Sequence, residues 1–212
     1  MTIIGQNYGD RLVKGVYDLI DAMAQNCGFE VTSVVEWPGQ SRNDGRILNL
    51  AGAEKTALEA LMQLKPYDSF SVLARSFGCI VAGSVFAKVS APERLILWGP
   101  PSYPILWRLF KRDINSTLRV AENKGTTLDP NVFESLIPFE ELYDGLPKKT
   151  SFVTGARDMY TTPQFLDFLK ASANPSKGFR FRIVNEAGHE VDCEAPVNVL
   201  AEYRAALFHD SK

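Results

Sequence analysis

The sequence has few of the residues that would build a disulfide-bonded domain or a metal centre. It contains three cysteines and two histidines among 212 residues, and no two cysteines form a Cys-x-x-Cys pair. An odd and scattered set of cysteines predicts neither a disulfide framework nor a structural zinc site. We therefore expect no metal and no cofactor, and this cysteine usage is typical of a reducing compartment such as the cytoplasm.

The sequence also lacks a large net charge and long apolar runs. The chain has 23 Lys and Arg residues against 25 Asp and Glu residues, a formal net charge of -2. A charge this close to zero gives no electrostatic reason to expect nucleic acid or an anionic membrane as a partner. The first residues show no basic region followed by an apolar stretch, and no apolar run reaches membrane-spanning length. A small molecule is the expected partner, and the oligomeric state is left open.

The chain does contain a regular alternation of strand-like and helix-like segments. Short apolar runs alternate with segments whose apolar residues recur at helical spacing. The predicted strands are residues 1–4, 29–36, 68–75, 94–99, 150–154 and 179–185, and the predicted helices are 11–26, 53–64, 77–88, 164–171 and 196–208. This alternation predicts an α/β fold with a mostly parallel sheet, helices on both faces, and a single domain spanning 1–212.

Residues 102–149 interrupt the alternation. Aromatic side chains are interleaved there with basic ones, and the segment leaves the sheet at the edge where parallel strands end. We expect short helices that form a small lid-like excursion over a cleft. An aromatic cluster is more often core than the wall of a pocket, so both interpretations of these aromatic residues stay open.

The junction between the strand ending at residue 75 and the helix that follows carries the first chemical signal. It reads Ala74-Arg75-Ser76-Phe77-Gly78, one substitution from the Gly-x-Ser-x-Gly turn that presents a nucleophilic serine. The residues two before and two after that serine must be small, because strand and helix approach closely there. Ala74 and Gly78 meet this requirement. In the alternative interpretation, Ser76 only caps the helix, as serine commonly does.

A serine hydroxyl becomes a good nucleophile when an imidazole accepts its proton and a carboxylate orients that imidazole. His189 follows the last predicted strand, at the edge where Ser76 lies, whereas His209 lies beyond the last apolar turn. Asp158 follows the preceding strand and is the candidate carboxylate. Asp192, only three residues after His189, is the weaker alternative.

Taken in order, these motifs resemble those of the α/β-hydrolase superfamily, and the resemblance covers nearly all of the chain. The matches are the serine turn at 74–78, Gly155-Ala-Arg-Asp158, Gly188-His189, and the loop 37–42, which is similar to the family's Asp-x-Pro-Gly-x-Gly-x-Ser loop. The family's antiparallel strands at the amino terminus have no counterpart before residue 1, so the resemblance implies about six strands.

The resemblance implies a serine hydrolase that cleaves a small ester or thioester through an acyl-enzyme intermediate. Ser76 would attack the acyl carbonyl, His189 would transfer the proton, and Asp158 would orient His189. The backbone N–H groups of Gln6 and Phe77 would bind the oxyanion, with Asn7 as an alternative to Gln6. An alternative of another class is a catalytically degenerate member that binds a small ligand or a protein partner.

Substrate contacts are expected from residues that lie beside the cleft by loop position. Arg75 precedes the candidate nucleophile and either meets a substrate carboxylate or forms a structural ion pair with a neighbouring acid. The other expected contacts are Trp37, Arg42, Tyr103 and Trp107.

Overall fold

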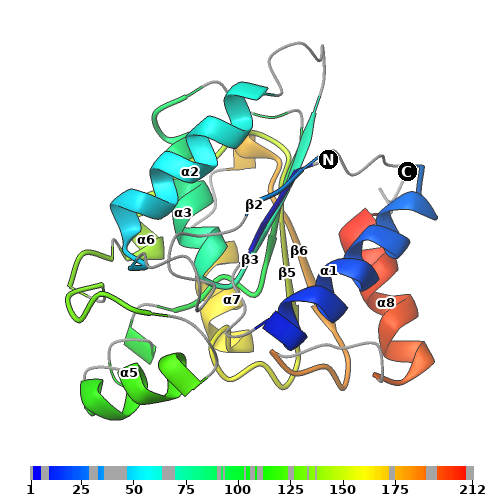
Figure 1. Cartoon of the computed structure of the whole chain (residues 1–212). Helices are drawn as coiled ribbons and strands as arrows, with labels where there is room; N and C mark the ends of the chain where they lie inside the picture. The colour runs from blue at the N-terminus through cyan, green and yellow to red at the C-terminus, as the bar shows by residue number, and fades with distance from the viewer. Residues whose placement is uncertain are drawn as a thin grey trace.

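The structure is a computed structural model of the chain. It describes residues 2–5, 10–28, 33–35, 47–63, 70–89, 92, 94–102, 104–105, 108, 112–123, 127–132, 134–136, 138–171, 175–189 and 195–208. In this part of the chain, the strands form one sheet in which every pairing is parallel (Figure 1). The sheet order is β2-β1-β3-β4-β5-β6. The strands are β1 (Thr2–Gly5), β2 (Ser33–Val35), β3 (Ser71–Arg75), β4 (Arg94–Trp98), β5 (Thr150–Gly155) and β6 (Arg180–Val184).

Helices cover both faces of the sheet, which confirms the predicted α/β architecture. Figure 1 shows α1 and α8 together on one face and α2 and α3 on the other. The described α-helices are α1 (Asp10–Gln25), α2 (Leu50–Gln63), α3 (Phe77–Phe86), α5 (Ile114–Asn123), α6 (Phe139–Leu142), α7 (Pro163–Ala171) and α8 (Val197–Phe208), and the 3-10 helices are η1 (Tyr143–Gly145) and η2 (Pro175–Lys177).

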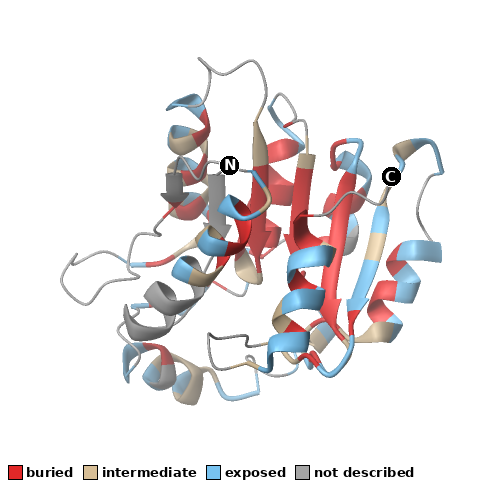
Figure 2. Cartoon of the chain, turned by 90° about the vertical axis from the view of Figure 1, so that its right-hand side faces the viewer, coloured by how far each residue is buried: buried red, intermediate tan, exposed pale blue. Residues whose placement is uncertain are grey.

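Alternating side chains of the strands enter two separate hydrophobic cores. In β3, Val72 and Ala74 belong to the core under α2, α3 and α7, whereas Leu73 belongs to the core under α1 and α8. The same alternation follows from the two-residue period of a strand. Figure 2 shows the central strands buried along most of their length, which explains why they are almost continuously apolar in sequence.

Most element boundaries fall within three residues of their predicted places. Helix α2 begins at Leu50 rather than at residue 53, because the Asn49 side chain accepts a hydrogen bond from the Gly52 N–H at 2.7 Å and caps the helix. Strand β2 occupies residues 33–35 of the predicted 29–36, and the rest of that prediction lies outside the described residues.

Part of the 102–149 segment contributes to the body of the protein. Phe139 and Tyr143 are buried in the core on the α2 and α3 side, which supports the core interpretation for these two aromatic residues. Leu142 packs where a side chain on Gly83 of α3 would be, 3.1 Å from the position of its Cβ. None of the described helices is long and apolar enough to cross a membrane.

Candidate active site

The sheet order reverses direction beside β1, which pairs with β2 on one side and β3 on the other. Ligand sites of open parallel sheets form at such a reversal, at the carboxyl ends of the strands. Gly5, the last residue of β1, is paired with Arg75, the last residue of β3. Ser76 therefore follows directly at the reversal point.

Ser76 has an unusual backbone conformation. Its φ is 52° and its ψ is −122°, in a region that L-residues other than glycine rarely occupy. Such strain is characteristic of the turn that lifts a nucleophilic serine above the sheet. The Ser76 side chain makes no capping hydrogen bond to α3, so the capping interpretation is wrong. Its Oγ instead lies 3.1 Å from Nε2 of His189.

His189 connects Ser76 to Asp158. Its Nδ1 lies 2.9 Å from Oδ2 of Asp158, while its Nε2 faces Ser76. An ionised carboxylate accepts hydrogen bonds only, so Nδ1 carries a proton, and in the neutral imidazole Nε2 is then left to accept from the serine hydroxyl. The side chains of His189 and Asp158 are only 9% and 2% exposed. The imidazole thus lies in the place that a base for Ser76 requires.

Asp158 is buried, yet its environment favours the charged form. Burial alone would raise the pKa of its carboxyl, but hydrogen bonds from His189 and the charge of His189 oppose this, as do the backbone N–H groups of Thr161 and Tyr160. The net effect is a pKa below the ordinary value of 3.8. The two backbone N–H groups donate to Oδ1 at 2.9 and 2.8 Å, whereas Oδ2 faces His189 at 2.9 Å and the Thr154 hydroxyl at 3.3 Å. Asp158 is therefore ionised at neutral pH.

Two glycines allow the strand ends to approach closely around this pair. Gly99 follows β4 with a φ of +61°, and a Cβ there would lie 3.3 Å from both Asp158 Oδ2 and His189 Cε1. Gly155 ends β5, and a Cβ there would lie 2.3 Å from the Ala187 carbonyl oxygen. The absence of a side chain at Gly155 is required for the Ala187 backbone to lie where it does, and at Gly99 it leaves Asp158 and His189 free of a crowded contact.

Tyr160 packs against the imidazole and was not predicted from the sequence. Its ring meets that of His189 edge to face, with centroids 4.6 Å apart, and the Tyr160 carbonyl accepts a hydrogen bond from the Ser102 N–H at 2.9 Å. Nearby, the Thr161 hydroxyl donates to the Pro100 carbonyl at 2.6 Å. The loop that carries Asp158 is thus fastened to the end of β4.

The remaining predicted site residues divide into those the structure describes and those it does not. Phe77 is the first residue of α3, where backbone N–H groups point out of the helix start. Arg75 is only 3% exposed, and its guanidinium donates to the His189 carbonyl at 2.9 Å. Gln6, Asn7, Trp37, Arg42, Tyr103 and Trp107 lie outside the described residues.

Among the described residues, no group of three or more His, Cys, Asp or Glu side chains is arranged to hold a metal ion. Cys79 in α3 is a fully buried thiol whose Sγ donates to the Ala74 carbonyl at 3.3 Å. Burial raises the pKa of this thiol well above its ordinary value. It therefore stays protonated and packs as a small core residue.

The sequence matches no protein-family model and no curated protein. Solved structures, in contrast, resemble the chain over almost its whole length. A monoacylglycerol lipase from Paleococcus ferrophilus is 16% identical and has a TM-score of 0.66, covering 97% of this chain and 90% of its own. A bromoperoxidase from Bacillus anthracis is 12% identical with a TM-score of 0.65, covering 97% and 89%.

A third structure, an extracellular alpha/beta-hydrolase from a Paenibacillus species, is 15% identical with a TM-score of 0.61 and covers 99% of this chain and 98% of its own. Together with the parallel sheet and the strained serine turn, these similar structures show that the chain has the α/β-hydrolase fold. At this level of identity the likeness establishes the fold, and the chemistry has to be argued from the site.

Proposed function

We propose that the protein is a serine hydrolase that cleaves a small ester or thioester. The observation that carries this proposal is the strained Ser76, whose Oγ turns away from α3 and toward Nε2 of His189 at 3.1 Å. A serine used only to cap a helix would have neither this conformation nor this partner. The esterase and lipase structures among the similar proteins support the same reaction class.

In the proposed mechanism, Ser76 Oγ attacks the acyl carbonyl while its proton passes to Nε2 of His189. Asp158, ionised and bonded to Nδ1, stabilises the resulting imidazolium. The imidazolium then protonates the leaving group, and an acyl-enzyme remains on Ser76. Water attacks this ester by the reverse sequence of proton transfers, which releases the acid and restores the serine.

The oxyanion of the tetrahedral intermediate needs backbone N–H donors beside Ser76. Phe77, as the first residue of α3, supplies one in this proposal. The second would come from the residue after β1, because Gly5 is paired with the residue that precedes Ser76. Gln6, or else Asn7, is the proposed donor. The substrate is a small neutral or weakly charged acyl compound, and the cytoplasm is the proposed location on cysteine usage alone.

The test is labelling with a fluorophosphonate probe, which reacts with activated serines, followed by intact mass and by turnover of short p-nitrophenyl esters. We expect one adduct and ester turnover in the wild type, and loss of both in Ser76→Ala. Ser71→Ala is the matched control, because Ser71 begins the same strand at its opposite end. It should keep both activities.

Asp158→Asn should retain the fold and lower kcat by about 10⁴-fold, because the amide can hold His189 in the wrong tautomer. If a folded wild-type protein forms no adduct and turns over no ester, the proposed catalytic function is wrong. The degenerate ligand-binding or partner-binding alternative would then explain the site.

A further inference from the structure

A cluster of buried side chains lies behind the triad, on the α1 and α8 face of the sheet. Arg75 comes two residues after Leu73 in β3, so it points to the same face as Leu73. Trp98 is the neighbour of Arg75 in β4, and the guanidinium carbon lies 5.2 Å from the centre of its ring. Tyr203 of α8 also packs against Trp98, with ring centroids 4.9 Å apart.

This cluster contacts the backbone of the loop that carries the base. The guanidinium of Arg75 donates to the His189 carbonyl at 2.9 Å, and the Tyr203 hydroxyl donates to the Gly188 carbonyl at 3.2 Å. Arg75, Trp98 and Tyr203 are 3%, 2% and 0% exposed, so the donors of both hydrogen bonds are buried, while the accepting residues Gly188 and His189 are half-buried. A charge-assisted bond from a guanidinium is stronger than a neutral one.

Arg75 and Ser76 are consecutive in the sequence, and each contacts a different part of His189. The Arg75 side chain binds the backbone carbonyl of His189, and the Ser76 hydroxyl faces Nε2 of its ring. Arg75 is the last residue of β3 and reaches the loop from the α1 and α8 face, whereas Ser76 lies in the strained turn that follows and presents its hydroxyl at the sheet edge. Both contacts with His189 thus come from the end of β3 and the residue that follows it.

We propose that Arg75, supported by Trp98 and Tyr203, is a positioning residue that sets the location of His189 relative to Ser76. This assignment replaces contact with a substrate carboxylate as the role of Arg75. It rests on the proposed hydrolase function for its kinetic consequences, although the anchoring of the loop can be measured without catalysis. A misplacement of the base by about 1 Å is enough to lower the rate by about 10²-fold.

The variant that tests this role is Arg75→Met, which keeps an unbranched apolar stem and removes the guanidinium. We expect kcat for a p-nitrophenyl ester to fall by about 10²-fold with KM within about threefold, because the base acts in the transition state and not in substrate binding. Arg75→Lys keeps the charge without the planar fork and should give an intermediate kcat. The rate of fluorophosphonate labelling should fall in parallel with kcat.

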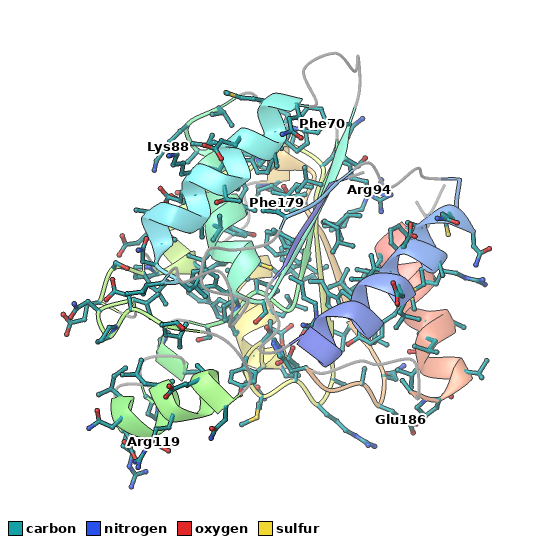
Figure 3. The ribbon with its side chains drawn as sticks, viewed as in Figure 1. Phe70, Lys88, Arg94, Arg119, Phe179 and Glu186 are labelled. Carbon is teal, nitrogen blue, oxygen red and sulfur yellow. The ribbon has the colours of Figure 1, made fainter. Side chains whose placement is uncertain are left out.

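Arg94→Met is the matched control. Arg94 also uses its guanidinium to bind backbone carbonyls, those of Leu207 and Phe208 at 3.0 and 3.4 Å, but it does so at the start of β4. Figure 3 shows Arg94 and Phe70 at one end of the sheet and Glu186, just before the His189 loop, at the other. Arg94→Met should lower the melting temperature and leave kcat unchanged.

Hydrogen exchange read by mass spectrometry gives a readout that does not depend on turnover. In Arg75→Met, we expect faster exchange in peptides covering residues 185–189, with no such change in Arg94→Met. Unchanged kcat and unchanged exchange in Arg75→Met, or equal effects in the two variants, would overturn the proposal. If the wild type forms no adduct and turns over no ester, the proposed hydrolase function is wrong. The hydrogen-exchange result then still decides whether Arg75 anchors the loop.

Tyr203→Phe covers the case in which Arg75→Met does not fold. It removes one hydroxyl and keeps the ring that packs on Trp98. We expect kcat to fall by several-fold and exchange at residues 185–189 to rise. Wild-type values of both in a folded Tyr203→Phe would contradict the role of this cluster.

Discussion

Replacement of Gly99 by alanine should lower kcat, because the new Cβ would displace Asp158 and His189 by a distance that can be worked out from the structure. The new Cβ would lie 3.3 Å from Asp158 Oδ2, 3.3 Å from His189 Cε1 and 3.4 Å from His189 Nδ1. Comfortable contacts begin at about 3.5 Å and extend to about 4.0 Å. The carboxylate and the ring must therefore retreat by a few tenths of an ångström. Both are hydrogen-bonded, and Tyr160 lies against the ring, so little room exists for this movement.

The expected loss follows from the size of the movement. If a misplacement of about 1 Å lowers the rate by about 10²-fold, a shift of about 0.3 to 0.5 Å lowers kcat by about four- to tenfold. Alanine at a φ of +61° also strains the backbone. That strain costs about 1 to 2 kcal/mol, which lowers the melting temperature of a chain of this size by about 2 to 8 °C.

Gly178→Ala separates the two effects. Gly178 has nearly the same φ, +64°, but a Cβ there would meet nothing within 4 Å. The assay is the steady-state hydrolysis of a p-nitrophenyl ester by both variants, together with their thermal unfolding. Both should lose similar stability, and only Gly99→Ala should lose kcat. Equal kcat values for the two variants, or a wild-type kcat in Gly99→Ala, would refute the reasoning.

Two further substitutions test the same pair of loops. Gly155→Ala would place a Cβ 2.3 Å from the Ala187 carbonyl oxygen and 2.6 Å from the Ala187 carbonyl carbon, so backbone must move. We expect a loss of about 1 to 3 kcal/mol in urea unfolding and a larger fall in kcat than in Gly99→Ala, whereas Gly188→Ala, whose Cβ would meet nothing within 4 Å, should behave as wild type. Asp158→Asn tests the lowered pKa of that carboxyl. A lowered pKa stabilises the folded state above pH 3.8 and loses this contribution as the pH falls through the folded-state value, so the stability gap between wild type and variant should shrink from pH 7 to pH 3. A gap that does not change with pH would contradict this electrostatic account.

The parts of the fold that depend on strand periodicity could be predicted from the sequence. Apolar runs and helical spacing are local properties, so they placed β4 and β5 to within one residue and β3 to within three. The carboxyl ends of parallel strands share one edge, and this rule was enough to bring Ser76, Asp158 and His189 to the same place. The start of α2 was predicted three residues late because Asn49 was not recognised as the residue that caps the helix.

The residues that surround Ser76, Asp158 and His189 could not be predicted in the same way. The direction of Arg75 depends on which face of the sheet α8 covers, and no local pattern encodes that choice. The two-residue period of β3 does predict that the Arg75 side chain lies on the same face of the sheet as Leu73. Gly99 was visible only as the end of a strand, since its contact with Asp158 and His189 requires the packing of β4 against β5.

Tyr160 illustrates a different limit. Its ring touches His189 because the turn after β5 wraps around the Asp158 carboxylate, which accepts the N–H groups of Tyr160 and Thr161. A sequence shows that such a turn exists, but the direction of its side chains follows from the hydrogen bonds it makes once folded.

Ser76 and His189 are far apart along the chain, so the proposed activity would depend on how far folding has progressed. The bond between their side chains joins residues 113 positions apart, and contacts of such separation form late because loop closure must precede them. We expect β3 and the turn after it to form before β6 and α8, and Ser76 would then have no imidazole to accept its proton. In a refolding experiment, reactivity toward a fluorophosphonate should therefore return with the docking of α8, after most of the helical signal has recovered. The proposed hydrolase activity should therefore appear only after the last elements of the fold have docked.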